Sequence, residues 1–414
     1  MKIIISIFFI CNLFFSWGQK QYAESILNDL CSDYYAGRGY VEDGVDKAGN
    51  YLIKAFKNIG VAPFPGRSYS QNYTFDVNTF PKDVAVQLDK ETLVAGVDYL
   101  VDANSGKTVG TYEPINISIN NYTTDIKQLK NSLRFKTILV FDARTIKSRD
   151  SIQAYHQLAI ASTKYYPIIW VSDAKLMYSV GRQQYKNALI TVLGNKYTPA
   201  KKITIQIEPE FKKDFENKNI IGFIPGKKDK KYIVLTGHYD HLGKMGQAMF
   251  PGANDNASGV AMLLSLAKYY TLNRPKYSLV IILFSGEEAG LEGSKYFVNH
   301  PFFPLEKIKF LLNVDIMGSA SDGITVVNGN VHPKYFKKLE KLNKKGNYLP
   351  LVKKRGPTQN SDHYFFSQTG VPSFFVYTMG DCKNYHDVYD TAAQTSLNNF
   401  DQVLALFIDF IDKM

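Results

Sequence analysis

The sequence has few cysteines, no internal repeats, no low-complexity tracts and only one long apolar run. Of its three cysteines, Cys11 lies in that run, which leaves Cys31 and Cys382 either as one disulfide or as two free thiols. No nucleic-acid-binding motif is present, and the lysines behind the net charge of +11 are scattered rather than gathered in a stripe. These absences exclude a repeat protein and predict no nucleic-acid partner.

The apolar run stands at the start, in MKIIISIFFICNLFFSWG, after a single lysine. It is shorter than the roughly 20 residues that a membrane-spanning helix needs, and the small residues Ser16 and Gly18 suit cleavage after residue 18. We interpret residues 1–18 as a signal peptide. We therefore expect an exported protein, periplasmic or extracellular, with no stable membrane insertion; the sequence does not indicate its oligomeric state.

The rest of the chain divides into three parts by pattern. Residues 19–75 predict helices, residues 76–205 predict short strands of an inserted β-rich domain, and residues 206–414 alternate strands with helices. This alternation, with apolar strands such as Tyr277–Phe284, predicts an α/β fold: a three-layer α/β/α domain with a central mixed, mostly parallel sheet. The insert contains no set of residues able to carry chemistry, so we assign catalysis to residues 206–414.

Two local features of the last part lead to further expectations. Apolar residues recur at helical spacing after Ser258, which we expect to cap that helix. The basic run Lys227–Lys231 stands between two strand-like segments, and we expect a solvated turn there rather than an anion-binding surface.

Histidines and acidic residues follow several predicted strands, which is where open α/β sheets place their sites. They are His238 and Asp240 in GHYDHLG, Asp255 in GANDNASG, Glu287 and Glu288 in FSGEEAG, Asp315 in NVDIMG, and His386 in YHDVYDT. Two imidazoles and three carboxylates can hold two divalent zinc ions around one shared carboxylate. A further carboxylate remains to take a proton from metal-bound water, so the set predicts a hydrolase.

The charge and spacing of these residues suit such a centre. Two zinc ions and three carboxylates sum to +1, which a bridging hydroxide would neutralise, and two histidines favour zinc over magnesium or calcium. Asp240 would point to the same side of an extended strand as His238 and orient its imidazole. Because neighbouring residues point apart, one of Glu287 and Glu288 can bind metal while the other acts as general base.

Several pieces of the chain together resemble the co-catalytic zinc aminopeptidases of metallopeptidase family twenty-eight, relatives of secreted bacterial leucyl-type aminopeptidases. These pieces are HYDHLG, GANDNASGVA, LFSGEEAGLEGS, LNVDIMG, SDHYFF and YHDVYDT. The resemblance is clearest over residues 219–414, and the stretch GRGYVEDGVDKAGNYLIKAFKNIGV also matches. The insert occupies the place where relatives often carry a protease-associated domain.

The resemblance implies two zinc sites that share one ligand. One zinc ion would lie on His238, Asp255 and Asp315. The other would lie on Glu288, His386 and again Asp255, which would bridge the pair.

It also implies roles for the residues around the metals. Glu287 would be the general base, Asp240 would orient the first histidine, and Tyr385 or a neighbouring hydroxyl would help to hold the oxyanion. The peptide bond Asp255–Asn256 would be cis.

Four other residues near these motifs have plainer interpretations. We expect His241 and His363 to support the ligands or line the pocket rather than bind metal. Asp362 and Asp390 are expected either to stabilise loops or to cap helices.

The expected function is an exported di-zinc aminopeptidase that acts on peptide substrates. A single-zinc glutaminyl cyclase-like acyltransferase is the first alternative, but such relatives lack the complete two-metal set that this chain carries. A glutamate-releasing carboxypeptidase is another, although the chain is short for the extra dimerisation domain of those enzymes. A non-catalytic binding protein on a peptidase scaffold is the third, and degenerate relatives of that kind usually lose a ligand or the base.

Overall fold

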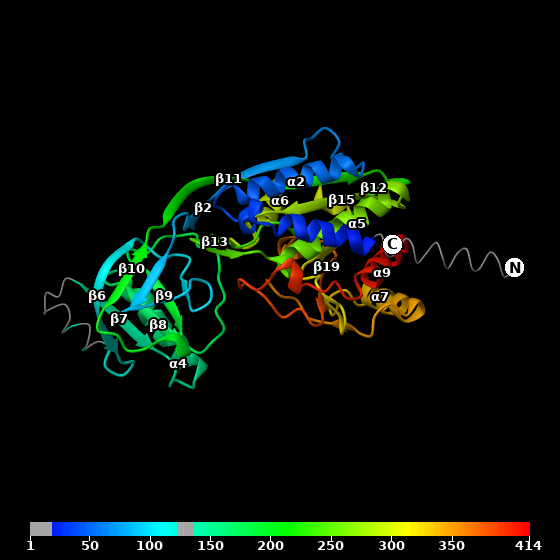
Figure 1. Ribbon diagram of the computed structural model, residues 1–414. Helices are drawn as coiled ribbons and strands as arrows, with labels where there is room; N and C mark the ends of the chain where they lie inside the picture. The colour runs from blue at the N-terminus through cyan, green and yellow to red at the C-terminus, as the bar shows by residue number, and fades with distance from the viewer. Residues whose placement is uncertain (1–18, 123, 125–126, 128–135) are drawn as a thin grey trace.

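The computed structural model describes residues 19–122, 124, 127 and 136–414, which form two lobes, each around its own β-sheet (Figure 1). The predicted signal peptide lies outside the described residues. No helix in the described part of the chain is long and apolar enough to cross a membrane. Cys31 and Cys382 are free thiols, so the disulfide alternative is wrong.

The larger lobe is built on a nine-stranded mixed sheet. Its strand order is β1 (Ala62–Pro63), β11 (Glu210–Ile224), β15 (Tyr277–Phe284), β12 (Lys228–His238), β16 (Ile308–Val314), β19 (Ser373–Met379), β17 (Gly323–Val327) and β18 (Val352–Lys354), with β2 (Ser70–Thr79) paired to β11. The four central strands, β15, β12, β16 and β19, run parallel, whereas β11 joins β15 and β17 joins β19 in antiparallel pairs. The predicted α/β class is confirmed, with antiparallel strands toward both edges.

Helices cover both faces of this sheet because its central strands are apolar on both sides. In β15, Leu279, Ile281 and Leu283 belong to one buried cluster, and the alternate residues Val280, Ile282 and Phe284 belong to another. The first cluster includes side chains of α2 (Gly44–Asn58), α5 (Ser258–Leu272), α7 (Pro333–Gly346) and α9 (Phe400–Asp412); the second includes those of α6 (Glu292–Asn299) and α8 (His363–Gln368). Each fully buried side chain of this size stabilises the fold by about 1.5–3 kcal/mol.

Two local expectations are wrong. Ser258 does not cap α5 but begins it; its hydroxyl donates to the Asn254 carbonyl at 2.7 Å and accepts from the Met317 amide at 2.7 Å. The basic run is not a turn, because β12 starts at Lys228, which lies opposite Tyr277 of β15. Sheet pairing therefore extends into a segment whose charged side chains remain exposed.

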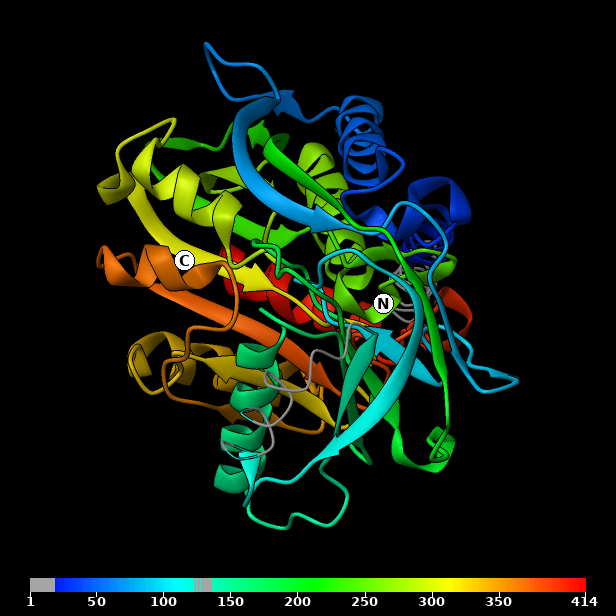
Figure 2. The ribbon, with the colours of Figure 1, turned by 90° about the vertical axis from the view of Figure 1, so that its left-hand side faces the viewer.

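The smaller lobe contains an eight-stranded sheet whose strands lie between residues 85 and 207. Its order is β4 (Glu91–Thr92), β3 (Ala85–Leu88), β10 (Ile203–Ile207), β6 (Thr108–Ile117), β7 (Thr137–Asp142), β8 (Ile168–Ser172), β9 (Leu189–Leu193) and β5 (Tyr99–Val101), and α4 (Arg149–Ser162) packs on it. The long pair β2 and β11 carries the chain out of the larger sheet and back (Figures 1 and 2).

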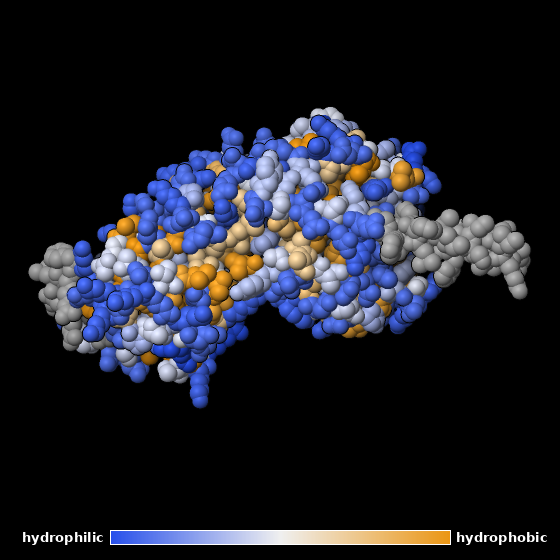
Figure 3. Space-filling view, in the orientation of Figure 1, coloured by the Kyte–Doolittle hydropathy of each residue, from blue (hydrophilic) through white to orange (hydrophobic). Residues whose placement is uncertain are grey.

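The two lobes share buried contacts as well as connecting strands. A hairpin of the larger lobe, β13 (Gly243–Met245) and β14 (Ala248–Phe250), places Met245 and Phe250 in the hydrophobic core of the smaller lobe. Val388, from a loop of the larger lobe, also packs on this core. The molecular surface is hollowed between the lobes (Figure 3).

Candidate metal centre

Three of the predicted ligands follow adjacent parallel strands. His238 is the last residue of β12, Asp315 comes directly after β16, and Glu288 lies four residues beyond the end of β15. Since β15, β12 and β16 are neighbours in the sheet, their carboxyl ends meet at one edge. Asp255 lies in the turn that leads into α5, and His386 lies in the loop after β19.

The structure brings all five predicted ligands together, with Asp255 in the middle. One Asp255 oxygen lies 3.2 Å from the His238 Nε2 atom, and the other lies 3.1 Å from the His386 Nε2 atom. The His238 Nε2 atom is also 3.3 Å from Asp315 Oδ1, and the His386 Nε2 atom is 3.3 Å from Glu288 Oε2. Two three-residue groups therefore share the Asp255 carboxylate.

The other nitrogen of each imidazole meets a backbone carbonyl. The His238 Nδ1 atom is 3.1 Å from the carbonyl oxygen of Asp240, and the His386 Nδ1 atom is 3.0 Å from that of Tyr178. A carbonyl only accepts hydrogen bonds, so Nδ1 carries a proton and Nε2 is the nitrogen that faces the carboxylates; a bound cation would take the Nε2 lone pair in place of a proton. Such a set of converging acceptors fits a cation, and two imidazoles with three carboxylates fit zinc.

The carboxylates of the cluster raise the pKa values of the groups beside them. Burial lowers the pKa of His386, but the carboxylates of Glu288 and Asp255 raise it to about 11. Burial raises the pKa of Glu287 well above its ordinary value, and the neighbouring Glu288 adds to the rise. Among the described residues, no lysine or arginine forms an ion pair with these acids.

Both adjacent glutamates come within 4.8 Å of His238, Glu287 in a group with Asp315 and Glu288 in a group with Asp255. A Glu287 carboxylate oxygen lies within 4.8 Å of ligand atoms of His238 and Asp315. Glu288 lies against His386, and its other oxygen is 2.7 Å from the Nδ1 atom of His241. His241 thus contacts the predicted ligand Glu288, as expected of a residue that supports the ligands.

The Asp240 carboxylate contacts the turn after β15 more closely than it contacts His238. It accepts a hydrogen bond from the Tyr40 hydroxyl at 2.7 Å and lies 3.3 and 3.4 Å from the amides of Glu287 and Glu288. Its separation from the His238 Nδ1 atom is 3.8 Å. The backbone of Asp240 therefore orients the imidazole, while its side chain holds the turn that carries both glutamates.

Tyr385 lies at the rim of the centre. Its ring stacks on the His386 imidazole with centroids 4.0 Å apart and an interplanar angle of 16°, and the residue is 38% exposed. This position covers one face of a predicted ligand. Its role toward an oxyanion stays a prediction.

Residues outside the predicted set support the loops that carry the ligands. Asp390 accepts from the amides of Asn254 and Asp255 at 2.8 and 3.0 Å, so of its two expected roles it has the loop-stabilising one. The Ser361 hydroxyl donates to Asp315 at 3.0 Å. The buried Arg38 donates to the carbonyls of Pro251 and Gly252, both at 2.6 Å.

The sequence contained no local signal for most of these contacts. Arg38 and Tyr40 stand in the matching GRGY stretch, but nothing in it indicates that they reach the turns around Asp255 and Asp240. The Asp255–Asn256 peptide bond is cis, as the resemblance implied. Asp362 is buried beside the start of α8 without capping it, and the buried His363 lies against Phe375 outside the ligand cluster.

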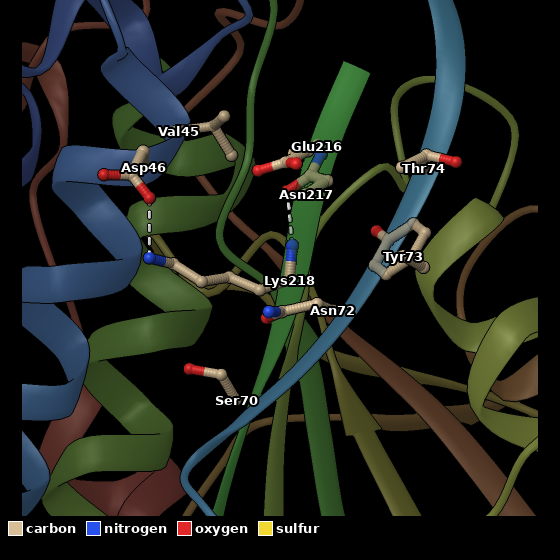
Figure 4. A pocket seen from close by; sticks show the side chains of 9 residues that line it. All are labelled: Val45, Asp46, Ser70, Asn72, Tyr73, Thr74, Glu216, Asn217 and Lys218. Carbon is tan, nitrogen blue, oxygen red and sulfur yellow. Dashed lines mark hydrogen bonds and ion pairs between the residues drawn. The ribbon is translucent and has the colours of Figure 1, made fainter. Parts of the chain in front are cut away.

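A separate pocket lies between α2 and the strands β2 and β11 (Figure 4). None of the predicted site residues lines it. Its one lysine, Lys218, is 2.6 Å from Asp46 and 2.9 Å from the side-chain oxygen of Asn50, so its charge is already paired. We assign no chemistry to this pocket.

Comparison with known proteins concerns mainly the larger lobe. Residues 219–411 match Peptidase family M28. A "Probable zinc metalloprotease" of Pyricularia oryzae is 36% identical over 107 residues, 25% of this chain and 21% of its own length. A "Vacuolar membrane protease" of Schizosaccharomyces pombe is 32% identical over 141 residues, 33% of this chain and 15% of its own length. The match therefore spans about a fifth or less of these relatives.

Solved structures extend the likeness to the whole architecture. BSAP, a zinc aminopeptidase from Bacillus subtilis, is 17% identical, with 95% of this chain and 94% of that chain covered and a TM-score of 0.70. The aminopeptidase from Aneurinibacillus sp. strain AM-1 is 19% identical, with 94% of each chain covered and a TM-score of 0.61. At these identities the likeness shows the fold, which includes both lobes.

Proposed function

We propose that this protein is a di-zinc aminopeptidase, since residues 219–411 match Peptidase family M28. The observation that carries the proposal is the Asp255 carboxylate, whose two oxygens face two imidazoles at 3.2 and 3.1 Å. A carboxylate in that position can bridge two cations. The likeness in fold to structures described as zinc aminopeptidases supports the same activity.

Different groups of the site would carry out different parts of the hydrolysis. Bound zinc would polarise the scissile carbonyl and make water a better nucleophile at neutral pH. Glu287, which lies beside His238 and Asp315, takes the proton from the attacking water and returns it to the leaving amine. Asp240 holds the turn that aims Glu287, through the two backbone amides it faces.

The complete ligand set favours two metals over the single-zinc alternative. A glutaminyl cyclase-like acyltransferase needs one ion, whereas here each of two imidazoles meets its own pair of carboxylate oxygens. The non-catalytic alternative is disfavoured because the base and all five ligands occupy one cluster.

One experiment tests this proposal against the alternatives. Purified protein is analysed for zinc by mass spectrometry and assayed on three substrates: leucine amide, an N-acetylated peptide, and a peptide with N-terminal glutamine. We expect two zinc ions per chain and hydrolysis of substrates that have a free N-terminus. Equal cleavage of the acetylated peptide would refute an aminopeptidase, and cyclisation of the glutamine peptide without hydrolysis would favour the acyltransferase.

We also propose that the protein acts outside the cytoplasm, on the basis of residues 1–18. The expected mature N-terminus is Gln19. Peptide mass mapping of protein from culture medium or periplasm checks this, and an intact residue 1 in that fraction would contradict it.

A further inference from the structure

A segment of the smaller lobe, Lys175–Arg182, lies against the candidate metal centre. It follows β8, and the backbone of Tyr178 makes two hydrogen bonds with His386, one to its backbone and one to its imidazole. The Tyr178 amide donates to the His386 carbonyl at 2.9 Å, and the Tyr178 carbonyl accepts from the His386 Nδ1 atom at 3.0 Å. The smaller lobe thereby determines which imidazole nitrogen carries the proton and how the ring is turned.

The two predicted histidine ligands differ in this respect. The Nδ1 partner of His238 is the Asp240 carbonyl, two residues along the same chain segment. The partner of His386 comes from another lobe and is 208 residues away in sequence. Only the second imidazole depends on how the two lobes dock.

An ion pair attaches the same segment to the His386 loop. The Lys175 Nζ atom is 2.5 Å from the carboxylate of Asp387, whose side chain is only 6% exposed, and it donates to the Tyr385 carbonyl at 3.3 Å. The residues on both sides of His386 are therefore held by one lysine of the smaller lobe.

Aromatic packing fixes Tyr178 itself. Its ring stacks on Phe250, with centroids 4.6 Å apart and an interplanar angle of 15°. Phe250 belongs to the hairpin that enters the smaller lobe's core and is followed directly by the turn leading to Asp255. The segment consequently packs against two of the ligand-bearing loops.

The far end of the segment reaches the turn that carries the glutamates. Arg182 pairs with Glu292 and donates to the Ala289 carbonyl at 3.4 Å. The Gly181 carbonyl accepts from the amide of Asn78 at 2.8 Å, which anchors this end to β2. The segment thus spans the centre from the His386 loop to the turn after β15.

We propose that Lys175–Arg182 is a positioning element of the metal centre, in which Tyr178 preorganises His386 so that zinc affinity at that end depends on docking of the smaller lobe. This inference rests on the proposed function for the identity of the metal. A partner that holds the Nδ1 proton of a ligating histidine commonly contributes about 10–100-fold to metal affinity. The effect should be confined to one of the two zinc sites.

The test measures zinc affinity rather than turnover. Metal-free full-length protein is titrated with Zn²⁺ in competition with a chromophoric chelator, for wild type, Tyr178→Ala and Lys175→Ala. Tyr178→Ala keeps the backbone carbonyl but removes the ring that fixes its position, so we expect it to weaken one of two binding constants by about 10-fold, the lower end of that range, and to leave the other unchanged. Lys175→Ala should weaken the same constant by a smaller factor.

Matched variants separate positioning from general damage. Tyr178→Phe keeps the ring that stacks on Phe250 and should restore wild-type affinity. Lys201→Ala removes an exposed lysine of the smaller lobe away from the centre and should bind zinc as wild type does. In a His386→Ala background, Tyr178→Ala should have no further effect on the remaining site, because the ligand it positions is gone.

The outcomes of these titrations test this inference separately from the proposed function on which it rests. A wild-type protein that binds no zinc would refute the proposed function. Two wild-type sites that both stay unchanged in Tyr178→Ala and Lys175→Ala would refute the inference alone. Thermal unfolding of the metal-free variants verifies folding, and if Tyr178→Ala does not fold, the exposed Lys175→Ala decides.

Discussion

Both lobes contain parallel strands whose carboxyl ends meet at one edge of a sheet, but the charged residues at those edges differ. In the smaller lobe, β7 ends at Asp142, and the Arg144 guanidinium lies 2.6 Å from its carboxylate. That pair is partly exposed, and hydrogen bonding by Arg144 lowers the pKa of Asp142. In the larger lobe, buried acids gather around two imidazoles with no lysine or arginine paired to them among the described residues.

The difference shows that topology alone does not make a site. A strand end supplies a place for a carboxylate in either lobe. Where a neighbouring arginine neutralises the acid, no bound cation is needed to balance its charge. Where acids are buried together without such a partner, their charge favours binding of a cation, and this distinguishes the two edges.

The largest effect should come from removing the shared carboxylate. Asp255→Ala takes a ligand from both zinc sites, so zinc content should fall from two ions to less than one per chain, with activity lost. Elemental analysis measures the content. The matched change at the other edge, Asp142→Ala, should leave zinc content unchanged; a similar loss there would abolish the contrast between the lobes.

Removing one terminal ligand should have a smaller effect on zinc content. His386→Ala leaves His238, Asp255 and Asp315 in place, so about one zinc ion per chain should remain. The same elemental analysis applies. Unchanged stoichiometry would remove His386 from the ligand set.

A change in the general base should affect rate without affecting metal. Glu287→Gln keeps the shape of the side chain but cannot accept the proton, so kcat should fall by about 10²–10⁴-fold while zinc content stays at the wild-type value. Steady-state kinetics on leucine amide measures the rate. A variant of near wild-type speed would show that Glu287 is not the base.

The smallest effect is expected from breaking the ion pair between Asp142 and Arg144 in the smaller lobe. Arg144→Ala removes an exposed ion pair, which is worth about 0.2–1 kcal/mol, and should leave zinc content and kcat unchanged. Since the folded-state pKa of Asp142 is lowered, the wild-type contribution is present above the ordinary carboxyl pKa and disappears as pH falls through the lowered value. Urea unfolding of both proteins at pH 7 and pH 3 checks this: their stability difference should shrink at the lower pH.

Much of the larger lobe could be predicted from local pattern. The strand β15 has the predicted bounds, since a continuous apolar run between polar residues has little alternative to a buried strand. The five candidate ligands could be named because histidines and acids in turns and loops that follow predicted strands carry recognisable chemistry. The strand β17 was not predicted, although its sequence GITVV is apolar, because periodicity alone does not distinguish a short apolar strand from a segment of a buried helix.

The α/β class and the residue types of the candidate centre follow from the amino-acid sequence, because apolar periodicity and ligand chemistry are properties of neighbouring residues. The contacts that hold those residues in place depend on how the chain folds. The tertiary structure puts the Tyr178 carbonyl on His386, the Tyr40 hydroxyl on Asp240 and the Arg38 guanidinium under the turn before Asp255. These contacts join residues about 200 positions apart, and only the packing of lobes and loops brings such groups within hydrogen-bonding distance.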